Sequence, residues 1–264
     1  MENVESGGKI LCEFRKLATE NNIRRLDDDF LRRFLVGHRY DVCAALKAIR
    51  NFQSFIERRQ DNWLKLEKGL VENILESQII DVLDEVGRHG QTIVWIRLEK
   101  WDPEVFSADE ILKVSALLCE LVYAKMKEIK FIDVIMDMHS FSLKHLNGLS
   151  MKFAKRMVFF MSECLPMELL HIYVVRQPKI IFYLGYALYK PFVEERMKKI
   201  IHICGDNYDY LTKNIGRDFL PVYFNGTCEN LKSTRWLNVM HQRKIRQDLS
   251  LSGYEFYEKS TGNT

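Results

Sequence analysis

The stretch TIVWIRLEKWDPEVFSADEILKVSALLCELVYAKMKEIKFIDVIMDM, residues 92–138, is the part of this chain that best indicates its fold. Its two ends, 92–98 and 131–138, are short runs rich in β-branched and aromatic residues, which favour strands. Between them, residues 108–127 repeat apolar side chains at three- and four-residue spacing, as an amphipathic helix does. A strand, a helix and a second strand in this order predict two parallel strands joined by a crossover helix.

The same alternation continues toward the C-terminus. Helical runs at 146–164, from about Ile180, and at 208–215 alternate with strand-like runs at 172–175 and 200–204. Strands that are separated by helical runs of this length favour a mostly parallel sheet flanked by helices. The predicted fold class is therefore α/β.

The segments on either side of this alternation differ from it. Residues 1–75 carry apolar positions at helical spacing without an alternating pattern, and they predict an all-helical region packed on the sheet. Asp41 is a suitable N-cap for the longest helix of that region. We expect the α/β domain to span residues 76–228, and the polar, basic segment 229–264 to form one helix and a flexible tail.

Composition and charge exclude several classes of protein. Among 264 residues, Lys and Arg number 39 against 36 Asp and Glu, a net charge of +3 that is too balanced for a nucleic-acid-binding protein. The six cysteines are scattered, without a Cys-x-x-Cys pair, which favours a reduced, cytoplasmic protein. We expect no nucleic-acid partner, no signal peptide and no membrane-spanning helix.

Common catalytic motifs are absent from the sequence. We find no Gly-x-Gly-x-x-Gly, Walker loop, Gly-x-Ser-x-Gly or His-Glu-x-x-His pattern. The best candidate for catalysis is Asp133, Asp137 and His139, which a strand would place on one face and which could hold a metal. Because no further ligands lie in the same region, we favour hydrogen bonding or solvent exposure for these residues, and expect no metal and no catalysis.

The run from Ile180 to Tyr189 is apolar on both sides of a helix. One side carries Ile180, Ile181, Leu184 and Leu188, and the other carries Phe182, Tyr186 and Tyr189. Such a helix is either buried in a core or lies between an apolar cavity and a bilayer. The cationic residues that follow suit contact with anionic head groups. The run itself is compatible with both locations.

Several motifs occur along the chain in a characteristic order. They are Phe30-Leu-Arg-Arg-Phe-Leu35 followed by Arg39-Tyr-Asp-Val42, then Arg97-Leu-Glu-Lys-Trp-Asp-Pro-Glu-Val-Phe106, His171-Ile172 with Gln177-Pro178, Lys190-Pro-Phe192, Ile201-His202, and Leu220-Pro221 with Gly226. Their order and spacing resemble the CRAL-TRIO lipid-binding family, most closely its tocopherol-transfer and retinaldehyde-binding branch. The resemblance extends from about Asp28 to Gly226.

This resemblance implies a closed hydrophobic pocket floored by the sheet and covered by a gate helix, Ile180–Tyr189. It implies non-catalytic binding of one hydrophobic small molecule and its transfer between membranes, without a cofactor other than that ligand. Tocopherols, retinoids, carotenoids and other isoprenoids are the ligand classes that it suggests. We expect a cytoplasmic monomer that contacts membrane surfaces transiently. The gate helix would use Ile180, Phe182, Tyr186 and Tyr189.

The resemblance also points to individual pocket residues. Ser115 matches a serine that approaches the ligand hydroxyl in the tocopherol-binding branch, and Cys119 stands where a second serine would be. A thiol is a poorer hydrogen-bond partner than a hydroxyl, so Cys119 indicates a less polar ligand. The remaining expected pocket residues are Phe131, Ile135, Ile172, Val174, Ile181, Leu184 and Leu188.

A basic patch for lipid head groups is the second feature that the resemblance implies. Arg196 and Lys198 match basic positions of the family, and Arg39, Lys190 and Lys199 would complete the patch. The alternative function is a phosphoinositide- or phospholipid-sensing membrane module. It is disfavoured because Glu168, Leu170 and Ile200 occupy positions where the family has basic residues, and a head group needs several cations.

Overall fold

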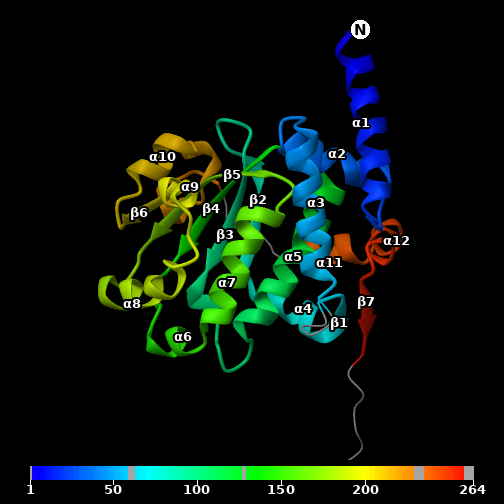
Figure 1. The fold of residues 1–264 in the computed structure, drawn as a ribbon. Coiled ribbons are helices and arrows are strands. Elements are labelled where there is room, and N and C mark those ends of the chain that lie inside the picture. Colours follow the sequence, from blue (N-terminus) through cyan, green and yellow to red (C-terminus); the bar gives the residue numbers. More distant parts are fainter. Residues whose placement is uncertain (1, 59–62, 127–128, 229–234, 259–264) are drawn as a thin grey trace, which may run out of the picture.

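A five-stranded sheet forms the centre of the computed structural model, which describes residues 2–58, 63–126, 129–228 and 235–258 (Figure 1). The strand order is β2-β3-β4-β5-β6, with β2 antiparallel to β3 and the other neighbours parallel. The strands are β2 Ile80–Val86, β3 Thr92–Arg97, β4 Phe131–Asp137, β5 Glu168–Val175 and β6 Ile201–Gly205. The predicted α/β class with a mostly parallel sheet is confirmed.

Crossover helices cover one face of this sheet. Because β3 to β6 are neighbours in chain order and crossovers are right-handed, successive connections fall on the same face. The connecting helices are α5 Ala108–Met126, α6 Leu143–Asn147, α7 Met151–Phe159 with a π-helical turn at Phe160–Cys164, α8 Lys179–Tyr189 and α9 Glu195–Ile200. Within the described ranges, no helix combines the length and apolar composition that crossing a bilayer requires.

The opposite face of the sheet is covered by α10, Asp209–Asn214, and by short turns near residue 220. Side chains that alternate along each strand point to different faces. On β4, Ile132 and Val134 belong to the larger core on the crossover side, whereas Ile135 belongs to a smaller core under α10. The sheet therefore separates two hydrophobic clusters.

The N-terminal helices pack against the crossover side. They are α1 Glu2–Glu20, α2 Asp28–Gly37, α3 Val42–Ile56 and α4 Lys68–Ser77. The Asp41 carboxylate accepts the backbone N–H of Ala44, so the predicted cap of α3 is confirmed. Phe55 of α3 lies with its ring centroid 5.1 Å from that of Phe160, which joins the helical region to the α/β part.

Three strands and the second C-terminal helix were not predicted from the sequence. Strand β2 was not predicted, and β1, Lys65–Glu67, pairs in parallel with β7, Glu255–Tyr257. The C-terminal segment contains two helices instead of one, α11 Arg235–Met240 and α12 Arg243–Leu251; residues 259–264 of the predicted tail lie outside the described residues. A three-residue pairing between segments so far apart leaves no local pattern, because its hydrogen bonds depend on the folded chain.

A close backbone approach at Gly37 gives a first prediction. A Cβ at this last residue of α2 would lie 1.9 Å from the carbonyl oxygen of Pro166, whereas one at Gly69 in α4 would meet nothing within 4 Å. We expect Gly37→Ala to lower the free energy of unfolding by about 1–3 kcal/mol or more, as overpacking does. Gly69→Ala should raise it by about 0.5–1 kcal/mol. Urea denaturation measures both, and equal effects would contradict the close approach.

Candidate functional site

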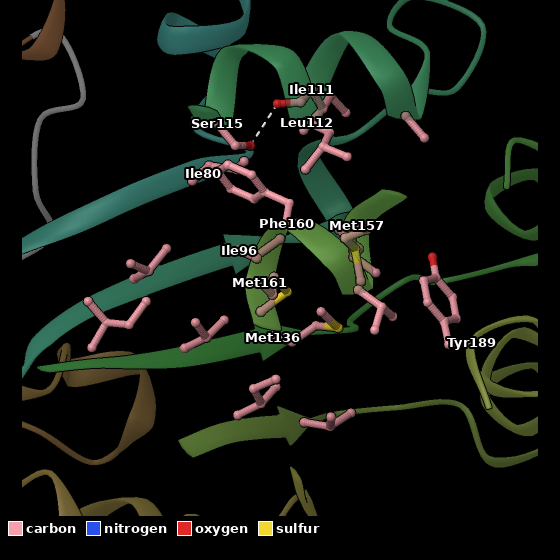
Figure 2. A pocket seen from close by; sticks show the side chains of 18 of the residues that line it. Ile80, Ile96, Ile111, Leu112, Ser115, Met136, Met157, Phe160, Met161 and Tyr189 are labelled. Atoms are coloured by element: carbon pink, nitrogen blue, oxygen red, sulfur yellow. Dashed lines mark hydrogen bonds between the residues drawn. The ribbon is translucent and has the colours of Figure 1, made fainter. Parts of the chain in front are cut away.

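A cavity of about 270 Å³ lies between the sheet and the crossover helices (Figure 2). Its walls come from strands β2 to β6 and from α5, α7 with its π-helical turn, and α8. Figure 2 shows apolar side chains from the strands and helices converging on the space between them. Central lining residues include Ile80, Ile96, Leu112, Met136, Met157, Phe160 and Met161.

The chemistry of these walls is almost wholly apolar. Among the described residues, none that lines the cavity carries a charged side chain. A bound molecule would be stabilised mainly by removing apolar surface from water, about 25 cal/mol for each Å². A charged group placed here would lose its hydration without gaining a counterion, at a large cost in free energy. The cavity therefore suits a neutral, hydrophobic ligand.

The strand residues of the wall follow the two-residue alternation of the sheet. Ile172 and Val174 of β5 line the cavity, in agreement with their predicted position. Ile135 does not, because it points to the opposite face and packs in the cluster under α10. Phe131, at the start of β4, also lies outside the lining. These two placements are corrected: lining residues of β4 occupy the even positions of the strand.

Helix α5 brings Ser115 and Cys119 to the cavity together, since residues four apart share one side of a helix. The Ser115 hydroxyl donates to the carbonyl oxygen of Ile111 at 2.7 Å, within its own helix. Burial, together with a smaller effect of the neighbouring Glu120 carboxylate, raises the pKa of the Cys119 thiol to about 12. Cys119 is therefore a neutral thiol at physiological pH and contributes an apolar surface.

Helix α8 is apolar on both sides, as predicted, but its orientation differs from the prediction. Its inward side presents Phe182, Gly185, Tyr186 and Tyr189 to the cavity. Ile181, Leu184 and Leu188, expected in the pocket, are not part of the lining. The helical spacing of the sequence shows which residues of α8 share a side. Because both sides are apolar, that spacing does not show which side faces the cavity.

Three large apolar side chains on the outward side of α8 are exposed to solvent. Ile180 is 79% exposed, Tyr183 59% and Leu184 53%. Single exposed apolar residues are ordinary, but three on one side of a helix that also lines a cavity are not. Such a helix can contact an apolar phase outside while it covers an apolar space inside.

Three of the five cations predicted for a head-group patch already bind other groups of the protein. Arg39 forms a bidentate ion pair with Glu168, with the closest atoms 2.8 Å apart. Lys198 pairs with Glu195 at 2.6 Å, and Arg196 donates to the carbonyl oxygen of Ser162 at 3.1 Å. Lys190 and Lys199 lie exposed at the end of α8 and on α9. Arg39 thus offsets Glu168 instead of adding to the patch.

Asp133 and Asp137, the two carboxylates of the catalytic site considered from the sequence, each bind different neighbours. Asp133 accepts a hydrogen bond from the Gln91 amide at 3.0 Å and lies 2.9 Å from His171 Nδ1. Burial raises the pKa of Asp133, and the contacts with Gln91 and His171 oppose that shift. Asp137 accepts from Arg176 Nε at 2.8 Å.

His139 lies beyond the end of β4 and does not join the two carboxylates. Its Nε2 is 3.9 Å from a carboxylate oxygen of Glu99. In the part of the chain that the structure describes, no group of three or more His, Cys, Asp or Glu side chains is arranged to hold a metal ion. The three residues singled out from the sequence therefore do not form one site.

Comparison with known proteins agrees with this architecture. A family model described as CRAL/TRIO domain matches residues 76–226. The chain is 26% identical over 229 residues to "Alpha-tocopherol transfer protein-like" of Homo sapiens, covering 86% of this chain and 65% of that protein. It is 25% identical over 219 residues to "Clavesin-1" of Rattus norvegicus, covering 82% and 62%. The chain thus spans less than two thirds of the length of these relatives.

A solved structure shares the fold. "Crystal structure of Sfh5" superposes with a TM-score of 0.59, covering 93% of this chain and 96% of the other at 12% sequence identity. At this identity the likeness concerns the arrangement of the sheet and helices alone.

Proposed function

This chain belongs to the CRAL/TRIO domain family of lipid-binding and lipid-transfer proteins, and we propose that it carries one hydrophobic small molecule between membranes in the cavity beneath α8. The observation that carries the proposal is the cavity itself, whose described lining residues have no charged side chain. Tocopherols, retinoids, carotenoids and other isoprenoids have the required apolar bulk. Their transfer makes and breaks no covalent bond, so the proposal includes no catalytic step and no cofactor.

We assign the role of a gate to α8. Its inward side covers the cavity, and its outward side exposes three apolar residues, Ile180, Tyr183 and Leu184. At a bilayer these outward residues would leave water for the acyl chains, which offsets the cost of separating the inward side from the cavity wall. The proposed protein is a cytoplasmic monomer that visits membrane surfaces to load and unload.

The runner-up is a module that senses phosphoinositides or other phospholipids. Two exposed cations, Lys190 directly after α8 and Lys199 on α9, favour it. The Arg39–Glu168 pair weighs against it, because a phosphorylated head group needs several unpaired, converging cations. A liposome pull-down distinguishes the two functions: tight binding that requires phosphoinositides, without extraction of a lipid, would support the sensor.

The proposed carrier function is tested first by native mass spectrometry after incubation with a mixed-lipid extract. We expect one hydrophobic molecule for each chain, which organic extraction then releases for identification. A folded protein that stays empty after this incubation would contradict the carrier function.

Substitution of a lining residue links that ligand to the cavity. We expect Cys119→Trp to lower ligand occupancy by about tenfold or more, because the indole takes up space that the ligand needs. Cys119→Ser, which keeps the side chain small, is the matched control and should retain occupancy. Circular dichroism checks that both variants fold. Full occupancy in folded Cys119→Trp would place the ligand elsewhere.

A further inference from the structure

Tyr189, the last residue of α8, brings a phenol to one end of the cavity (Figure 2). Its surroundings are apolar, and this burial raises the pKa of its hydroxyl, so the group keeps its proton and is a hydrogen-bond donor. Among the residues that the structure describes, none forms a hydrogen bond with this hydroxyl. A polar group in such a place is stabilised when a partner is supplied.

Two other donors around the cavity, Ser115 and Trp101, are already engaged within the protein. Ser115 donates its hydroxyl hydrogen to Ile111, and Figure 2 shows it on the side of the cavity away from Tyr189. Trp101 donates its indole N–H to the carbonyl oxygen of Phe106 at 2.7 Å. Thr92 of β3 and Tyr186 of α8 also line the cavity, and both carry a hydroxyl.

The apolar walls of the cavity can adjust to ligands of different shape, so they discriminate only weakly between such ligands. Six methionines line the cavity, namely Met136, Met138, Met157, Met161, Met167 and Met197. Methionine side chains are unbranched and flexible, so they fit apolar ligands of different outline. The direction in which a ligand lies is then decided by its polar group and by the donor that binds it.

We propose that the ligand is a neutral molecule with one hydrogen-bond-accepting oxygen, which Tyr189 binds at the α8 end of the cavity. The hydrocarbon part then lies toward Ser115 and Cys119. This inference rests on the proposed carrier function and names the ligand class and its orientation. It reverses the direction that Ser115 suggested, because the Ser115 hydrogen is engaged within α5 whereas the Tyr189 hydrogen is free among the described residues.

The position of Tyr189 couples the ligand to the gate. The hydrogen bond would join the ligand to α8 itself, so a bound ligand stabilises α8 over the cavity. Movement of α8 at a bilayer would break that bond and free the polar end of the ligand first. An occupied carrier therefore opens less readily in water than an empty one.

Three probes that share one branched C20 skeleton test the inference: phytane, a hydrocarbon; phytol, an alcohol; and phytanic acid, ionised at neutral pH. Affinities are measured by partition of each radiolabelled probe between vesicles and the intact protein. We expect Tyr189→Phe to weaken phytol binding by about 3–10-fold, the worth of one hydrogen bond, and to leave phytane unchanged. Phytanic acid should bind the unmodified protein about tenfold or more weakly than phytol.

Matched variants separate this role from a structural one. Tyr257→Phe, which removes an exposed phenol of β7 outside the cavity lining, should leave the affinities for all three probes unchanged. An equal loss for phytane and phytol in Tyr189→Phe would show that the phenol only supports the wall, and would overturn the inference. If phytol binding is lost selectively in Ser115→Ala, Thr92→Val or Tyr186→Phe instead, another hydroxyl of the lining binds the ligand, and the inference is overturned as well. If none of the probes binds the unmodified protein, the carrier function fails and the inference fails with it.

Discussion

Replacing Ile180 and Leu184 together with aspartate is expected to weaken binding to vesicles by about a hundredfold or more. Both side chains are more than half exposed, so the folded protein tolerates a charge there. Burying one such side chain in a bilayer contributes about 1.5–3 kcal/mol, and both contributions disappear in the double variant. An aspartate also resists entry into the acyl region. Ligand transfer should slow accordingly, whereas ligand occupancy of the cavity should remain.

Vesicle co-sedimentation and transfer of a fluorescent lipid between donor and acceptor vesicles measure these effects. Leu251→Asp with Tyr257→Asp is the matched control, because both residues are exposed and belong to α12 and β7, on the opposite side of the molecule from α8 (Figure 1). It introduces the same two charges. If the control weakens vesicle binding as much as the α8 variant does, general repulsion explains the loss and α8 is not the membrane contact.

Replacing Glu120 with leucine is expected to lower the free energy of unfolding by about 3–5 kcal/mol. Glu120 of α5 lies 2.9 Å from Arg33 of α2 and 3.5 Å from Arg25, and its side chain is 3% exposed. Removing the carboxylate leaves the Arg33 guanidinium buried without its counterion. This pair connects the N-terminal helices with the helix that carries Ser115 and Cys119, so its loss should also loosen the cavity wall.

Urea denaturation of a set of variants tests this reasoning. The double variant Arg33→Met with Glu120→Leu should be more stable than either single variant, since it removes both charges together. Glu168→Gln, which breaks the exposed pair with Arg39, should change the free energy of unfolding by only about 0–1 kcal/mol. A Glu120→Leu variant as stable as Glu168→Gln would show that the buried pair contributes little.

Much of the fold follows from local patterns in the sequence. The alternation of strand-like and helical runs from residue 92 to 215 predicted strands β3 to β6 and their crossover helices, and the structure confirms them. Strand β2 and the β1–β7 pair were missed. Strand β2 lies before the region where alternation was recognised, and the β1–β7 pair exists only because α11 and α12 return the chain to residue 65.

The candidate cavity was predictable in part. Ser115 and Cys119, four residues apart on one helix, were expected together and both line the cavity. Ile135 was expected to line the cavity and does not, and the side of α8 expected to face the cavity is not the one that does. In β4, apolar residues occupy both sides of the strand, and Ile135 packs as tightly under α10 as Val134 does beside the cavity. Two apolar sides have the same periodicity, so the pattern alone does not distinguish them.

Local sequence patterns were sufficient to predict most helices and strands and to show which of their residues share a side, because backbone geometry sets those spacings locally. The motif order also identified the family. The folded structure was needed to learn which sides of α8 and β4 face the cavity, and that the Tyr189 hydroxyl has no hydrogen-bond partner among the described residues. These outcomes depend on how distant segments pack, since a side chain's neighbours come from the whole fold and not from its own stretch of sequence.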